Sequence, residues 1–141
     1  MLSLLNISKE THMTRINVVP VTELCDQHLL AEHRELTRIP NCVAKGRYNL
    51  KGQPFRYTLG TGHVKFFYDK LFWLNKRYKA LTRECKARGF NVQYIWPDLT
   101  GIDVNLKKDY IVTEDALRIN RERIQERLEG MENPRWTKGE G

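Results

Sequence analysis

Residues 64–85, VKFFYDKLFWLNKRYKALTREC, decide the fold of this chain. Apolar side chains recur in them at the i, i+3, i+4, i+7 spacing of one helix face: Val64, Phe67, Tyr68, Leu71, Leu74, Tyr78, Leu81 and Cys85. Gly89 follows where a C-terminal cap belongs, so we expect one helix of about six turns. Its other face carries basic residues that either are solvated or follow phosphates: Lys65, Lys76, Arg77, Lys79, Arg83, Lys86 and Arg88.

A second helix is predicted upstream of this stretch. Pro20 disfavours helix at the residue before it and Thr22 is suited to be an N-cap, so we run this helix from Thr22 to about Arg38. One stripe of it combines core positions with a carboxylate: Leu24, His28, Ala31, Glu35 and Arg38. Residues 41–62 are rich in Gly, Pro, Asn and basic residues without a sustained period, which indicates a loop.

A third helix is predicted near the C-terminus. Thr113 can cap it, Glu114 and Asp115 suit the positive end of its dipole, and Gly130 marks its end. Alternating Arg and Glu predict a salt-bridged outer face, with these apolar residues inward: Leu117, Ile119, Ile124 and Leu128. The fold class that follows is all-α, a compact single domain of three main helices with an extended N-terminal segment packed against them.

Composition narrows the function classes. The 141 residues suit one domain, and 24 Lys and Arg against 17 Asp and Glu, a net charge of +7, favour a polyanionic partner. The three cysteines have no C-x-x-C spacing and indicate buried thiols in a reducing cytosol. The four histidines fall into no metal-ligand spacing, so neither a metal nor a cofactor is expected.

Three blocks of the sequence carry a resemblance to a known family. They are MTRIN at 13–17, ELCDQHLLAEHREL at 23–36 and LGTGHVKFFYDKL at 59–71. These blocks resemble the bacteriophage endonuclease V family of pyrimidine dimer DNA glycosylases. A looser correspondence continues through DYI at 109–111, the third helix and Trp136.

The resemblance implies a base excision repair enzyme with DNA glycosylase and AP lyase activities. In that family the initiator methionine is removed, and the α-amine of the next threonine, here Thr14, attacks the sugar carbon that bears the damaged base. A Schiff base forms, and β-elimination then breaks the strand. Glu35 falls on the catalytic carboxylate. The implied DNA-binding residues are Arg15, Gln27, His28, Arg34, Arg38, Arg123 and Trp136.

The implied partner is double-stranded DNA that contains UV photoproducts or abasic sites, bound by a monomer. No apolar run reaches the length of a membrane span, so no membrane partner is expected. We expect a cytoplasmic protein, in the host cell cytoplasm if the gene is phage-encoded.

Thr14 is internal in the chain as numbered, and an amide nitrogen is no nucleophile. We therefore expect translation to start at Met13, which makes residues 1–12 a leader and 13–141 the glycosylase domain. Lys9-Glu10 supports this expectation, because the codons AAGGAG for these two residues would form a ribosome-binding purine run.

The implied chemistry is physically reasonable. An α-amino group has a reference pKa near ~7.7 to 8.0 and a lysine near ~10.4, so a chain terminus is the readier nucleophile. Departure of the base leaves positive charge on the sugar, which Glu35 can stabilise before it accepts a sugar proton. An extended segment of eight residues from Thr14 to Thr22 is also long enough to fold back along the helix to Glu35.

Less specific explanations exist for the same residues. A Glu beside an Arg on a helix is usually a surface pair, and a His on an apolar stripe is usually a core residue. Two other functions remain open: a noncatalytic basic DNA-binding module, and a helical interaction protein that binds an acidic partner. Steep weakening by salt distinguishes true phosphate binding from the second of these.

Overall fold

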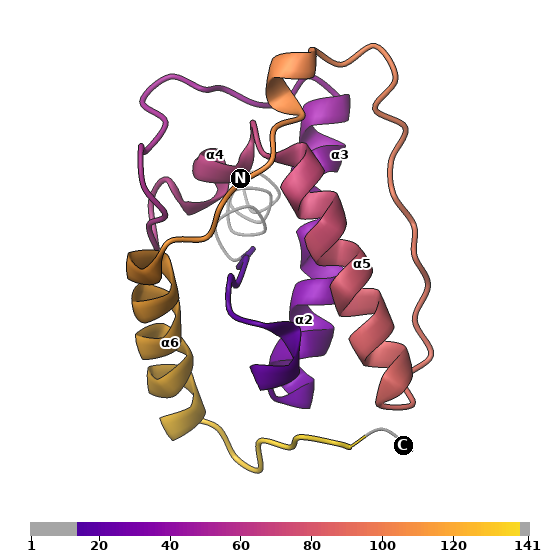
Figure 1. The fold of residues 1–141 in the computed structure, drawn as a ribbon, viewed down its shortest axis with the longest axis vertical. Helices are drawn as coiled ribbons and strands as arrows, with labels where there is room; N and C mark the ends of the chain where they lie inside the picture. Colours follow the sequence, from indigo (N-terminus) through magenta and orange to yellow (C-terminus); the bar gives the residue numbers. More distant parts are fainter. Residues whose placement is uncertain (1–13, 139–141) are drawn as a thin grey trace, which may run out of the picture.

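The structure, a computed structural model, describes residues 14–138 and contains helices but no β-strand within that range (Figure 1). The longest are α2 (Asp26–Leu36), α5 (Leu71–Ala87) and α6 (Glu114–Glu129). Shorter ones are η1 (Val21–Glu23), α3 (Arg38–Ala44), α4 (His63–Phe67) and η2 (Val104–Leu106). The predicted all-α fold with three main helices is confirmed. Met13 and the predicted leader lie outside the described residues.

The helix predicted over residues 22–38 is not continuous: this range contains most of η1, all of α2 and the first residue of α3. The backbone at Leu24 and Cys25 is extended, and α2 starts only at Asp26, so Thr22 does not cap it. This break turns the fully buried Leu24 into the core. The backbone N–H of Asp26 donates to the carbonyl of Arg135 at 2.6 Å, so the C-terminal tail satisfies a helix-terminal donor that no local side chain caps.

The chain also stays helical beyond the predicted end at Arg38. After Thr37 it continues as α3 to Ala44, so the predicted loop starts at 45 rather than at 41. Pro40 is the third residue of α3, where its missing N–H would have had no partner in the helix.

The predicted helix over 64–85 is broken into α4 and α5 at residues 68–70. A distant segment docks on the break: Lys108 donates its N–H to the carbonyl of Asp69 at 3.1 Å, and Trp73 donates to the carbonyl of Lys108 at 3.3 Å. The apolar pattern continues in phase across the break, which is why it predicted one helix. At the far end, the cap at Gly89 is confirmed. Its φ of +93° lets the N–H of Phe90 reach the carbonyl of Cys85 at 2.9 Å.

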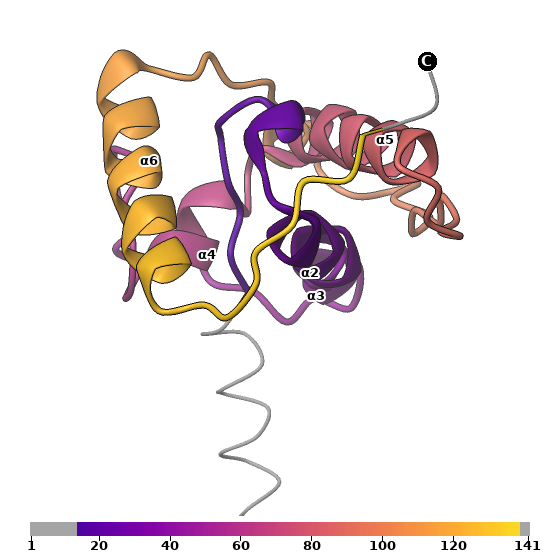
Figure 2. The ribbon, with the colours of Figure 1, turned by 90° about the horizontal axis from the view of Figure 1, so that it is seen from below.

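The core lies where α2 packs against α5, and α4 adds side chains to it. Its fully buried side chains include Leu29, Leu36, Phe66, Phe67, Leu74 and Leu81. Residues 14–19 run as an extended segment between α6 and α2 (Figure 2). Ile16 and Val19 of this segment have no exposed surface, and each such burial is worth about 1.5–3 kcal/mol. The predicted extended segment packed against the helices is therefore confirmed.

The third helix follows its prediction closely. The side chain of Thr113 accepts a hydrogen bond from the N–H of Ala116 at 3.0 Å, which makes it the N-cap of α6. Its outer face is salt-bridged, as Arg118 contacts Asp115 and Glu122. The predicted inward apolar residues are only partly buried, because the fully buried positions are Ala116 and Asn120. None of the helices between residues 14 and 138 is long and apolar enough to span a membrane.

Candidate active site

The extended N-terminal segment is held on one side by the 57–63 region. The backbone N–H of Ile16 donates to Nε2 of His63 at 2.8 Å, and the hydroxyl of Tyr57 donates to the carbonyl of Ile16 at 3.0 Å. His63 donates its Nδ1–H to the carbonyl of Thr58 at 2.7 Å, since Nε2 must be the acceptor. Burial lowers the pKa of His63 to about 4, so its imidazole is neutral at neutral pH.

On the other side, Asn120 of α6 fixes two consecutive amides of the segment. Its Oδ1 accepts from the N–H groups of Val18 at 2.7 Å and Val19 at 3.2 Å. Its Nδ2 donates to Oδ1 of Asn17 at 2.8 Å, and Asn17 donates in turn to Glu32 of α2 at 2.9 Å. Asn120 has no exposed surface. The segment therefore cannot slide along α6 without leaving buried polar groups unpaired.

A buried ion pair completes this network. Arg77 of α5 donates from Nε and Nη2 to the two carboxylate oxygens of Glu32, at 2.8 and 3.0 Å. Its Nη1 donates to the carbonyl of Val19. The Glu32 side chain has no exposed surface and the Arg77 side chain is 6% exposed. Arg77 thus belongs to the structural network and not to a phosphate-binding strip. Arg88 is likewise buried, against Asp26 and Glu84, so the predicted basic face loses two members.

These contacts bring Thr14 and Glu35 to a common neighbour. Nη1 of Arg38 lies 3.5 Å from Oγ1 of Thr14 and 3.8 Å from Oε1 of Glu35. Thr14 is buried, whereas the Glu35 side chain is 17% exposed. The start of the described segment and the carboxylate of α2 therefore meet at one guanidinium group.

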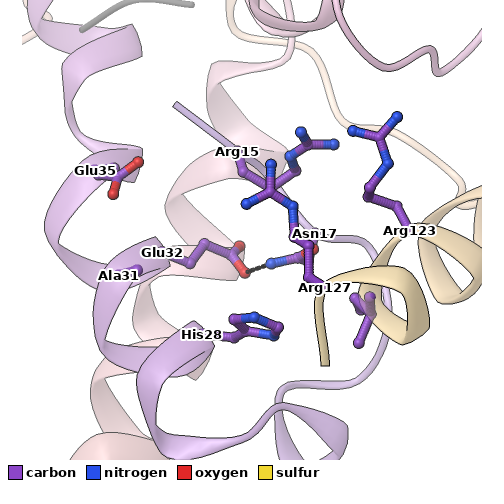
Figure 3. A pocket seen from close by; sticks show the side chains of 9 residues that line it. Arg15, Asn17, His28, Ala31, Glu32, Glu35, Arg123 and Arg127 are labelled. Carbon is purple, nitrogen blue, oxygen red and sulfur yellow. Dashed lines mark hydrogen bonds between the residues drawn. The ribbon is translucent and has the colours of Figure 1, made fainter. Parts of the chain in front are cut away.

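Glu35 faces a pocket of about 150 Å³ between the N-terminal segment, α2 and α6 (Figure 3). The lining residues are Arg15, Asn17, His28, Ala31, Glu32, Glu35, Arg123, Ile124 and Arg127. The α2 stripe predicted to combine core with a carboxylate thus faces this pocket at His28, Ala31 and Glu35. The core-facing residues of α2 are Asp26, Leu29, Glu32 and Leu36.

The pocket is electropositive and contains unpaired donors. Nε and Nη1 of Arg15 are buried and have no hydrogen-bond partner among residues 14–138. Burial, and then the positive charges of Arg127 and Arg123, lower the pKa of Arg15. Buried guanidinium donors are normally satisfied, and a phosphate oxygen matches them in charge and geometry. The arrangement is therefore suited to an anion.

The two carboxylates of the pocket are not equivalent. Glu32 is fully engaged by Arg77 and Asn17, which leaves it no capacity for chemistry. Within residues 14–138, the ion pairs of Glu35 have the longer distances of 3.5 Å to Arg34 and 3.8 Å to Arg38. His28 lies beside them, and burial, followed by the charge of Arg127, lowers its pKa. Of the two carboxylates, Glu35 is therefore the one whose oxygens are available to interact with a substrate.

The predicted site residues fall into two groups. Arg15, His28, Glu35 and Arg123 line the pocket, and Arg38 lies beside Thr14 at its edge, with the exposed Arg34 outside it. Gln27 and Trp136 do not line the pocket. Gln27 bonds Asn133 and Arg135, and the indole of Trp136 donates to the carbonyl of Glu23 at 3.1 Å. Both residues hold the C-terminal tail against the start of α2.

Sequence reasoning missed four residues of the site: Asn17, Glu32, Asn120 and Arg127. The spacing of Asn120, Arg123 and Arg127 at three and four residues places them on one helix face, and that pattern was readable. The pairing of Glu32 with Arg77 was not readable, because the two residues are 45 positions apart in the sequence and lie on different helices.

One comparison with known proteins bears on this site. A family model described as pyrimidine dimer DNA glycosylase matches residues 13–98. The matched range includes the N-terminal segment, α2 and α5. It ends before α6, so the family match does not cover Arg123 and Arg127, which line the pocket, or Asn120, which holds the N-terminal segment.

Proposed function

The chain belongs to the pyrimidine dimer DNA glycosylase family, and on this premise we propose that it is a DNA repair glycosylase with AP lyase activity that acts through the α-amine of Thr14. The contact of Arg38 with both Thr14 and Glu35 is the observation that carries this proposal. Its substrates are double-stranded DNA with UV photoproducts or abasic sites.

In the first step, the amine of the enzyme takes the place of the damaged base on the sugar. The unprotonated amine of Thr14 attacks C1′ of the damaged nucleotide, the bond from C1′ to the base nitrogen breaks, and the base leaves with its electron pair and takes up a proton. Positive charge develops on the sugar during this step, and the carboxylate of Glu35 stabilises it. Arg38 carries a positive charge beside Thr14 and so disfavours protonation of the amine.

The second step cuts the strand. The sugar ring opens to a Schiff base, which acidifies the hydrogen at C2′. Glu35 accepts this proton, the C3′–O bond breaks, and the strand on the 3′ side of the lesion leaves with a phosphate at its 5′ end. Water then hydrolyses the Schiff base and regenerates the amine. Two steps thus use one amine and one carboxylate.

The arginines of the pocket position the DNA in this proposal. The unpaired Nε and Nη1 of Arg15 bind a phosphate oxygen next to the damaged sugar, and Arg123 and Arg127 contribute from α6. The exposed Arg34 binds the phosphate backbone of the DNA from outside the pocket. The chemistry requires a damaged nucleotide whose C1′ is accessible, which a duplex offers only after the nucleotide leaves the stack.

The mechanism needs a free amine at position 14. We propose that the active form begins at Thr14, after translation from Met13 and removal of that methionine, so that 1–12 is a leader and 13–141 the domain. Inspection of the gene upstream of Met13 tests the start site. Intact-mass analysis of the native protein that gave a chain starting at Met1 would contradict it.

Borohydride trapping on a duplex with one abasic site tests the chemistry. Protein that starts at Thr14 should form a covalent adduct, and the same protein with an acetylated N-terminus should form none. The Glu35→Gln variant should lose strand cleavage, while the exposed Glu129→Gln serves as the charge-matched control. If unmodified protein binds duplex in a salt-dependent way but forms no adduct, the noncatalytic DNA-binding module is the correct function.

A further inference from the structure

Phe55 is an aromatic side chain that the proposed site does not use. It is 95% exposed, the largest exposed fraction among the large apolar residues of the described chain. Single exposed apolar residues are common and need no explanation by themselves. Phe55 differs from such residues in how firmly its neighbours are held.

The residues on both sides of Phe55 are anchored to the folded body. Nε2 of Gln53 lies within 3.0–3.2 Å of the carbonyls of Lys65 and Phe66 and of Oδ1 of Asp69. On the other side, Tyr57 is buried and bonded to Ile16. The Phe55 ring is therefore held in solvent on a fixed base.

Pro54 packs so closely against position 62 that this position must be a glycine. A Cβ atom built on Gly62 would lie 2.7 Å from Cγ of Pro54, and the φ of Gly62 is +92°. Both facts exclude another residue at position 62 without a rearrangement. The residue immediately before Phe55 thus has little freedom to move.

The segment that carries Phe55 is uniformly basic. Residues 45–58, here called the basic arm, contain Lys45, Arg47, Lys51 and Arg56 and no acidic residue. The acidic residue that shares a surface hollow with Phe55 is Asp115, and Arg118 neutralises it at 2.7 Å. A surface of this charge is complementary to a polyanion and not to a basic or neutral protein partner.

The basic arm lies next to the proposed site. Tyr57, two residues from Phe55, bonds to Ile16, two residues from Thr14. The hollow beside Phe55 is lined by Thr113, Asp115 and Ala116 at the first turn of α6, and the pocket by Arg123 and Arg127 further along the same helix. The arm runs past that first turn (Figure 1). Asp115 and Arg123 are eight residues apart on α6, about 12 Å along the helix axis, so a duplex of a few base pairs is long enough to span both.

We propose that the basic arm is a second DNA-contacting surface, on which Phe55 stacks against the bases of the duplex beside the damaged nucleotide while its Lys and Arg residues bind phosphates. Aromatic and apolar side chains that enter a base step unstack it and bend the duplex, which helps a nucleotide to leave the helix. This inference rests on the proposed DNA substrate, but not on the amine chemistry.

Tryptophan fluorescence tests the base contact directly. In Phe55→Trp, the emission of the new indole should be quenched on addition of an undamaged duplex at low salt. Phe72→Trp is the matched control, because Phe72 is also exposed and beside a basic residue, with Nζ of Lys76 5.1 Å from its ring, and it lies outside the arm. Phe55→Ala should weaken duplex binding on the order of 10-fold, the range of one lost base stack.

Three results would overturn the inference. One is unchanged emission of Phe55→Trp with the duplex. Another is equal quenching by polyphosphate, a polyanion without bases, which would mean that the ring meets no base. The third is unaltered duplex affinity of Phe55→Ala with unaltered thermal stability. Borohydride trapping of the parent protein is scored separately, so quenching without an adduct refutes only the amine mechanism, and an adduct without quenching refutes only the arm.

Discussion

The backbone N–H of Ile16 donates its hydrogen bond to a histidine, Nε2 of His63, at 2.8 Å. The segment two residues beyond the proposed nucleophile therefore depends on a side chain that must stay neutral. Protonation of Nε2 would turn this acceptor into a donor and set two donors against each other.

The first prediction concerns pH. Burial lowers the pKa of His63 from 6.5 to about 4, so the unfolded state binds more protons than the folded state between these values. The neutral histidine stabilises the fold above pH 6.5, and this contribution falls as pH drops from 6.5 to about 4. It amounts to roughly 3 kcal/mol. Denaturant unfolding of parent and His63→Gln should show a difference in pH slope within this window; parallel slopes would contradict the assignment.

The second prediction concerns Asn120. Asn120→Ala removes the acceptor of Val18 and Val19 and leaves both amides buried. The free energy of unfolding should fall by roughly 2–3 kcal/mol. Because the segment that carries Thr14 loses its register, the rate of adduct formation on abasic DNA should fall as well. Gln125→Ala, at an exposed position of the same helix, should alter neither quantity.

The third prediction separates the two carboxylates of α2. Glu32→Gln breaks a buried pair with Arg77 and should cost about 3–5 kcal/mol of stability. Glu35→Gln should leave stability within about 0.5 kcal/mol and lower strand cleavage by roughly 10²–10⁴-fold. Combining Glu32→Gln with Arg77→Met removes the unpaired charge and should restore part of the stability. A Glu35→Gln enzyme with full cleavage activity would exclude Glu35 as the catalytic group.

The fourth prediction concerns phosphate binding in the pocket. Arg15→Gln removes unpaired buried donors, so duplex binding should weaken and the slope of log K against log[salt] should decrease by about 1. Arg118→Gln is the charge-matched control, since Arg118 is exposed and engaged by Asp115 and Glu122. Equal slopes for Arg15→Gln and the parent protein would place the phosphate elsewhere.

Much of the fold could be predicted because its signals are local. The periodic apolar residues located α5 and α6, and the caps at Gly89 and Thr113 occur where their backbone chemistry requires. The predictions failed at helix breaks. Residues 68–70 leave the helix because Lys108 takes the carbonyl of Asp69, and Leu24 leaves it to become buried. Neither cause is visible within a window of neighbouring residues.

For the candidate site, resemblance in the sequence named Thr14, Glu35 and several arginines, and periodicity placed Glu35 on a helix. The sequence by itself determined the helical class, the approximate positions of the three main helices and the chemical groups available. Only the tertiary structure decided which groups meet: that Glu32 is bound to Arg77, that Arg127 joins Arg15, and that Asn120 sets the register of the N-terminal segment. The reason is physical, because helix formation depends on neighbours a few residues apart, whereas pairing of buried polar groups depends on how separate segments pack.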